Sequence, residues 1–183
     1  MPRGSYQNSG TTGAEFRVVE HAPGAPGLRL IGMGSRWLPR RAVKQLQALL
    51  NQHTFWARQR SRTQLKHMLK ASDAVVSVWR GPELVGFGRA SSDGTYRAVL
   101  WDVVVAAEYQ GLGLGTVVVN SLLNSRQLRH VERVYLMTTS SSSFYERLGF
   151  SQVTQQHLLV KACQSAAPDT QIWRTSAHTN ADG

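Results

Sequence analysis

Three glycines at alternate positions, Gly111, Gly113 and Gly115, lie between an apolar run and a helical pattern. Glycine has no Cβ, so the backbone at such positions can approach a ligand closely. The first N–H groups of a helix are unpaired and lie at the positive end of its dipole, so a glycine turn that opens a helix favours a phosphate or pyrophosphate. The turn therefore predicts a site for an anionic cofactor.

The elements that must position this turn follow from hydrophobic patterns. The run from Val99 to Val105 is β-branched and apolar, which is typical of a buried strand, and it carries one carboxylate at Asp102. A helical stretch from Val117 to Leu123 follows the glycines. We expect a strand, a phosphate-sized turn and a helix in direct succession.

Two widespread glycine motifs do not fit this segment. The P-loop, Gly-x-x-x-x-Gly-Lys-Ser/Thr, requires a lysine before the hydroxyl residue, but Gly115 precedes Thr116. The dinucleotide fingerprint Gly-x-Gly-x-x-Gly requires a glycine at 116 or 118, where Thr116 and Val118 stand. The pattern that is present is Gln110-x-x-Gly113-x-Gly115.

This pattern resembles the pyrophosphate loop, Gln/Arg-x-x-Gly-x-Gly/Ala, of the GNAT superfamily of acetyl-CoA-dependent N-acetyltransferases. A second segment, Phe144 to Phe150, is similar to the FYxxxGF segment of that superfamily. The continuous stretch from Leu84 to Phe150 is similar to the plastid and cyanobacterial GNAT proteins described as serotonin-type N-acetyltransferases. The similarity is weaker from Leu28 to Trp79 and absent in both tails.

The resemblance implies a fold and a coenzyme, acetyl-CoA. The expected fold is mixed α/β (α+β): a twisted sheet of about six or seven strands, splayed at its central strand by a bulge, with about four helices. In the family the pantetheine arm of the coenzyme pairs with the central strand, and the pyrophosphate binds the glycine turn. The strand positions are Val103, Val104 and Val105, and the turn positions are Gln110, Gly111, Leu112, Gly113, Leu114, Gly115 and Thr116.

Two residues are candidate proton carriers. Asp102 shares a strand face with apolar neighbours, so burial would raise its pKa toward the range of a useful base. A salt bridge to Arg89 or Arg97 would instead give Asp102 a structural role. Tyr145, in the FYxxxGF segment, has a phenol that can contact the coenzyme sulfur and protonate the leaving thiolate. We expect Asp102 to act as the base and Tyr145 as the acid.

The acceptor side of the site is expected on two helices and their link. The patterns predict helices from Pro39 to about His53 and from Arg62 to Lys70, joined by an aromatic loop. Phe55, Trp56 and Trp101 are predicted to bind the acceptor, although packing of Phe55 and Trp56 in the core is an equal alternative. By resemblance the acceptor is an arylalkylamine such as serotonin or tryptamine, or a protein lysine or N-terminus.

The remaining segments give the domain organisation. We expect a disordered tail over 1–13, one acetyltransferase domain over 14–163 and a loose tail over 164–183. Further strands are predicted at Phe16 to Glu20, Leu28 to Met33, Ala74 to Trp79, Leu84 to Arg89, Val134 to Met137 and Val153 to Val160, and a short helix at Ser142 to Leu148.

Composition limits the functional classes. The net charge is +10, and every charged residue from Arg36 to Lys70 is basic. We interpret this charge as a solvated helix face or as steering of the anionic coenzyme, and attraction of an acidic substrate or of nucleic acid is the alternative. A non-catalytic module that binds CoA or associates with nucleic acid is the alternative to an enzyme. Cys163 is the sole cysteine and the histidines lack metal-ligand spacing, so we expect no metal. The absence of an apolar targeting or spanning segment predicts a cytoplasmic protein that does not enter membranes.

Overall fold

The computed structural model describes residues 5–6, 16–24 and 39–161 of the chain. These residues fall into two compact units, Met1–Ser141 and Ser142–Gly183. The predicted strand from Leu28 to Met33, Cys163 and the predicted C-terminal tail lie outside the described residues.

The first unit is built on one mixed sheet. Within the described residues its strands follow the order of the chain, and each pairs with the next in antiparallel fashion except the last pair, which is parallel. The strands are β1 (Ser5–Tyr6), β2 (Phe16–His21), β3 (Ala74–Arg80), β4 (Glu83–Ser92), β5 (Arg97–Val105) and β6 (Arg133–Tyr135). The predicted mixed α/β fold is confirmed.

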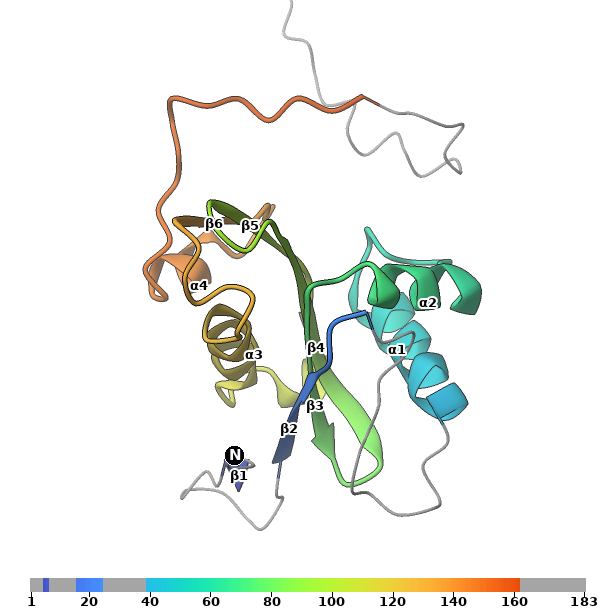
Figure 1. The fold of residues 1–183 in the computed structure, drawn as a ribbon. Helices are drawn as coiled ribbons and strands as arrows, with labels where there is room; N and C mark the ends of the chain where they lie inside the picture. The colour runs from blue at the N-terminus through green and yellow to red at the C-terminus, as the bar shows by residue number, and fades with distance from the viewer. Residues whose placement is uncertain (1–4, 7–15, 25–38, 162–183) are drawn as a thin grey trace, which may run out of the picture. The chain divides into compact units, whose positions relative to one another are not determined.

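Helices cover both faces of this sheet (Figure 1). α1 (Pro39–His53) and α2 (Arg62–Lys70) lie on one face, and α3 (Leu114–Leu123) lies on the other. The ends of α2 follow from its sequence, because Ser61 and Gln64 form a reciprocal capping box at its start. The boundaries predicted for α1 and α2 are confirmed.

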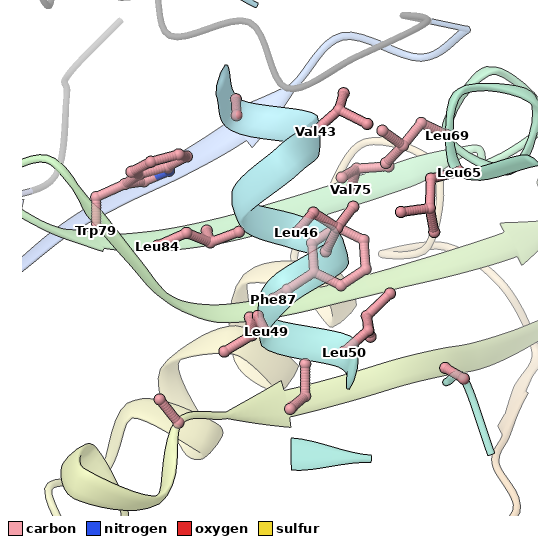
Figure 2. Packing of buried hydrophobic residues seen from close by; sticks show 14 residues of the cluster. Val43, Leu46, Leu49, Leu50, Leu65, Leu69, Val75, Trp79, Leu84 and Phe87 are labelled. Atoms are coloured by element: carbon pink, nitrogen blue, oxygen red, sulfur yellow. The ribbon is translucent and has the colours of Figure 1, made fainter. Parts of the chain in front are cut away.

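The core beneath α1 is formed by apolar side chains at helical spacing. Leu46 and Leu50 of α1 pack against Phe87 of the sheet, and the three side chains are no more than 1% exposed (Figure 2). Burial of a side chain of this size stabilises the fold by about 1.5–3 kcal/mol. This packing fixes α1 to the sheet.

A β-bulge interrupts the pairing of β4 with β5. Phe87 pairs with Val104 and Arg89 pairs with Trp101, so Gly88 lies opposite two residues, Asp102 and Val103. A Cβ on Gly88 would lie 2.6 Å from Cγ1 of Val118 in α3, closer than any ordinary contact. The glycine therefore allows α3 to pack directly on the bulge, and the predicted irregularity at the central strand is confirmed.

Two boundaries at the edges of the predicted elements need correction. α3 begins at Leu114 instead of Val117, because Gly113 adopts a left-handed conformation (φ 79°) and serves as its N-cap. β6 is shorter than predicted and ends at Tyr135. Gly115 and Thr116 consequently belong to the first turn of α3 and not to a preceding loop.

The second unit contains α4 (Ser142–Glu146), which ends before the predicted Leu148. The predicted strand from Val153 to Val160 is wrong: this stretch has no strand and its apolar side chains are exposed, Leu159 by 88%. An apolar run favours a strand only where another strand pairs with it. None of the helices in the described ranges combines the length and the apolar character required to span a bilayer.

Candidate active site

Strand β5, next to the edge strand β6 of the described sheet, has one edge that is open over most of its length. β6 pairs only with its first residues, Arg97 to Val99. Within the described residues no strand pairs with that edge from 100 to 105, where Val103, Val104 and Val105 lie. Backbone groups at such an edge can bind an extended ligand as an added strand. This geometry fits the predicted pantetheine site.

The predicted phosphate turn follows directly from this strand. A short 3-10 helix, η1 (Ala107–Tyr109), leads into Gln110, whose side-chain amide donates to the carbonyl of Val105 at 3.1 Å. Gly111 and Gly113 both have φ 79°, a left-handed backbone conformation that residues other than glycine adopt only with strain. A Cβ at either position would meet no described atom within 4 Å, so the space beside the turn is open to a ligand.

The first turn of α3 provides backbone donors next to this space. Gly113 has no side chain with which to cap the helix, and Leu114 anchors the turn with a side chain that is 4% exposed. Gly115 and Thr116 occupy the same turn, and the helix bonds begin with the Val117 N–H donating to the Gly113 carbonyl at 3.1 Å. The N–H groups that precede this bond are suited to a pyrophosphate.

Asp102 lies at the bulge, in the left-handed region with φ 52°. Its Oδ2 atom accepts hydrogen bonds from Nε of Arg89 at 2.7 Å and from Nη1 of Arg60 at 3.0 Å. Its Oδ1 atom accepts from the indole N–H of Trp56 at 3.3 Å. The carboxylate side chain is 4% exposed, so three donors replace water around it.

The electrostatic state of Asp102 differs from the prediction. Burial acts to raise its pKa, but the positive charges of Arg60 and Arg89, together with their hydrogen bonds, outweigh this effect and lower the pKa below its ordinary value. The expected raised pKa is wrong, and the alternative salt bridge to Arg89 is confirmed. Arg97 pairs instead with Glu132 at 3.0 Å.

Arg60 is the member of this site that the sequence did not indicate. It stood out only as one cation in a basic segment, far from Asp102 along the chain. The link between α1 and α2 brings it to the bulge, and Gln47 of α1 holds the link by donating to the Arg60 carbonyl at 2.8 Å. Gln59, at φ 63°, donates its backbone N–H to Asn51 Oδ1 at 3.0 Å and fixes the bend.

Of the three predicted acceptor residues, Trp56 bonds the Asp102 carboxylate, Phe55 contacts Trp56, and Trp101 precedes Asp102 in the sequence. Phe55 and Trp56 are 39% and 44% exposed and meet edge to face with ring centres 4.9 Å apart. Packing of these two rings in the core is therefore excluded. Trp101 donates to Ser91 Oγ at 2.8 Å, and the Arg89 guanidinium lies 5.6 Å from the centre of its ring. Acceptor binding by these residues stays a prediction.

Tyr145 belongs to the second unit. Its ring packs edge to face between Phe144 and Phe150, with centre distances of 4.9 Å and 5.8 Å. Burial raises the pKa of its phenol, so the hydroxyl carries its proton throughout the neutral range. This state suits a proton donor, and the catalytic role stays a prediction.

Fold and site together define a mixed α/β protein in which an open strand edge runs into a glycine turn at the start of a helix, and comparison with known proteins gives the family. The family described as "Acetyltransferase (GNAT) family" matches residues 43–150 of the 183-residue chain. The chain belongs to the GNAT acetyltransferase family, which uses acetyl-CoA. Across the described ranges no group of three or more His, Cys, Asp or Glu could hold a metal ion.

Individual relatives resemble part of the chain. "Uncharacterized N-acetyltransferase ycf52" of Pyropia yezoensis is 37% identical over 91 residues, which are 47% of this chain and 52% of the relative. "Histone acetyltransferase TAP1" of Glycine max is 38% identical over 68 residues, which are 37% of this chain and 29% of the relative. The chain thus spans about half or less of the length of these two relatives.

A solved structure shares the fold. The crystal structure of a GNAT-family protein from Xanthomonas campestris superposes with a TM-score of 0.59 at 19% identity, covering 82% of this chain and 98% of that one. At this identity the likeness concerns the architecture alone.

Proposed function

We propose that the protein is an N-acetyltransferase that transfers the acetyl group of acetyl-CoA directly to a primary amine, the acceptor being an arylalkylamine such as serotonin or tryptamine. The observation that carries the proposal is the open edge of β5 running into a glycine turn at the start of α3. A thioester coenzyme needs both an extended backbone edge for its arm and a set of N–H donors for its phosphates.

The residues for the coenzyme are those of the strand and the turn. Val103 to Val105 would pair with the pantetheine arm, and the N–H groups of Gly111 to Thr116 would bind the pyrophosphate. When bound, acetyl-CoA supplies a thioester that is open to attack by a neutral amine. Residue 116 is Thr where the family frequently has Lys or Arg, so phosphate binding relies on backbone N–H groups and on the Thr116 hydroxyl.

Tyr145 is proposed to protonate the leaving thiolate, because burial keeps its phenol protonated, and the proton that the attacking amine loses is proposed to pass through water to the phenolate and restore it. Asp102 is proposed to position other residues and not to act as a base. Its carboxylate is held ionised by Arg60 and Arg89, and a carboxylate with a lowered pKa is a weak proton acceptor. The three hydrogen bonds it accepts fix Trp56 and Arg60 at the acceptor side.

An arylalkylamine is proposed because Trp56, which bonds this carboxylate network, and Phe55, which packs against Trp56, are both exposed aromatic side chains. Aromatic rings bind other rings by stacking or edge contacts. Acetylation of a protein lysine is the second candidate, supported by the relative named as a histone acetyltransferase. The basic character of the segment from Arg36 to Lys70 disfavours lysine-rich acceptors by repulsion.

The test measures thiol release from acetyl-CoA with tryptamine, serotonin and a lysine-containing histone peptide, alongside calorimetric binding of acetyl-CoA. Gly113→Val should abolish coenzyme binding, because φ 79° is strained for valine and its side chain would enter the ligand space. Gly94→Val is the matched control: Gly94 has φ 77° and open space, but lies in the β4–β5 turn. Equal loss in both variants, or unchanged affinity in Gly113→Val, would remove the pyrophosphate assignment.

A further inference from the structure

The network around Asp102 contains more positive than negative charge. Two guanidinium groups, those of Arg60 and Arg89, share a single carboxylate, so one elementary positive charge is left over. Among the described residues neither arginine forms a salt bridge with a second acid. A positive charge that is partly removed from water without a counter-charge is costly, and an anion brought to it would recover that cost.

Both guanidinium groups also keep hydrogen-bond donors to spare. Arg60 gives Nη1 to Asp102 Oδ2 and to the Met68 sulfur, and within the described part of the chain its Nε and Nη2 have no acceptor. Arg89 gives Nε to Asp102, which leaves its two terminal nitrogens without an acceptor there. The side chains are 31% and 17% exposed, so Arg60 is the more accessible of the two.

The accessible guanidinium lies beside the exposed rings. Trp56 and Arg60 both donate to Asp102, one to each oxygen, so the indole and the guanidinium are held at the same carboxylate. The Trp56 N–H is already used by this bond, and the ring offers a molecule only its apolar surface. A ring against Phe55 and Trp56 would therefore place a short acidic substituent within reach of Arg60.

We infer that the acceptor carries a carboxylate as well as an aromatic ring and a primary amine, and that Arg60 binds this carboxylate while Phe55 and Trp56 bind the ring. The inference rests on the proposed acetyltransferase function. It keeps the aromatic ring and the primary amine of the acceptor but adds a carboxylate, which serotonin and tryptamine lack, so we expect acceptors that carry one to be preferred over these two amines. Planar guanidinium and carboxylate groups match in geometry, and the spare nitrogens of Arg60 allow the contact without breaking the bond to Asp102.

Equilibrium binding tests the contact without any turnover. The probes are indole-3-acetate and indole-3-acetamide, which share ring and size and differ in charge. A charge-assisted hydrogen bond to Arg60 should make the acetate bind about ten- to a hundredfold more tightly. Arg60→Gln should remove this preference, and Arg60→Lys, which keeps the charge, should retain part of it. Arg58→Gln is the matched control, because Arg58 is exposed in the same link and its guanidinium donates to the Thr54 carbonyl.

Kinetics with tryptophan and tryptophanamide then connect binding to transfer. Both carry the amine beside the ring, and rates are compared per neutral amine from full pH profiles. We expect a higher kcat/KM for tryptophan through a lower KM, lost in Arg60→Gln and kept in Arg58→Gln. Equal binding of the two indole probes, or a preference that survives Arg60→Gln, would overturn the inference. The inference would also be overturned if Arg60→Gln lost affinity for acetyl-CoA but still preferred indole-3-acetate over indole-3-acetamide, because Arg60 would then bind the coenzyme.

The two proposals can fail separately. Acetylation of tryptamine and serotonin without any preference for the carboxylate would sustain the transferase function and overturn the anionic acceptor. A charge preference in binding without acetyl transfer to any amine would sustain the anion contact and remove the proposed function.

Discussion

Asp102→Asn is the substitution that best separates a positioning role from a catalytic one. Asparagine keeps the size of the side chain and tolerates the left-handed backbone at φ 52°, so the bulge itself is not strained by the change. It removes the negative charge between Arg60 and Arg89, whose nitrogens lie 3.0 Å and 2.7 Å from Oδ2. The two guanidinium groups are then left facing each other without compensation.

The expected loss of stability follows from the burial of the three groups. Removal of one partner from a fully buried ion pair costs about 3–5 kcal/mol, and exposed pairs contribute at most about 1 kcal/mol. The carboxylate is 4% exposed but its partners are 17% and 31% exposed, so we expect a decrease of about 2–4 kcal/mol in the free energy of unfolding. Asp102→Ala should cost about 1 kcal/mol more, because alanine adds backbone strain at this φ.

The assay is thermal and urea unfolding of the wild type and both variants, with Arg97→Gln as control. The pair of Arg97 with Glu132 is about half exposed on each side, so its loss should leave the unfolding midpoint nearly unchanged. Because the folded pKa of Asp102 is lowered, its stabilising contribution is present above the unfolded pKa, near 4, and is lost as the pH falls through the folded value. The difference between wild type and Asp102→Asn should therefore shrink below about pH 4.

The pH dependence of kcat/KM in the wild type and in Asp102→Asn tests whether Asp102 acts as a base. A group that is ionised throughout the working range cannot give kcat/KM an acidic limb above about pH 5. The residual activity of Asp102→Asn should therefore follow the same pH profile as the wild type. A variant of normal stability whose acidic limb has disappeared would refute the positioning role and restore Asp102 as the base.

Three further predictions test other parts of the molecule. Gly88→Ala should lower the free energy of unfolding by about 1–3 kcal/mol through its clash with α3, and Val118→Ala in the same chain should restore part of this loss in urea melts. Tyr145→Phe should reduce kcat by about 10²-fold or more with little change in acetyl-CoA affinity. Steady-state kinetics would measure the first effect and calorimetry the second. Charge reversal at Arg58 and Arg62 should slow acetyl-CoA association in stopped-flow measurements at low salt, and added salt should reduce the difference.

Much of the fold could be predicted because its signals are local. The helical patterns that predict α1 and α2 and the β-branched apolar run that predicts β5 each depend on neighbouring residues. The segment from Val153 to Val160 shows the limit of such patterns. Its apolar composition favours a strand, but strand formation also needs a partner, which composition does not contain.

The candidate site divides in the same way. The glycine turn could be predicted because backbone freedom and a helix start are properties of consecutive residues. The state of Asp102 could not, because burial and ion pairing shift the pKa in opposite directions and their balance depends on distant residues. Arg60 reaches the carboxylate only through the bend at Gln59, a left-handed position that glutamine rarely adopts and that no pattern indicates.

The bulge in β5 affects both faces of the sheet, because Asp102 and Val103 both lie opposite Gly88. Opposite Gly88, Asp102 accepts hydrogen bonds from Trp56 and Arg60 in the link between α1 and α2. Val103, together with Val118 and Leu122 of α3, lies close to the position that a Cβ on Gly88 would occupy. Two adjacent residues of one strand therefore serve opposite faces of the sheet. Side chains also alternate between the two faces of a regular strand. The extra residue of the bulge, however, gives Asp102 its left-handed conformation, in which the carboxylate bonds Arg60, Arg89 and Trp56. A change that regularises the bulge should consequently disturb the acceptor side and the packing of α3 together.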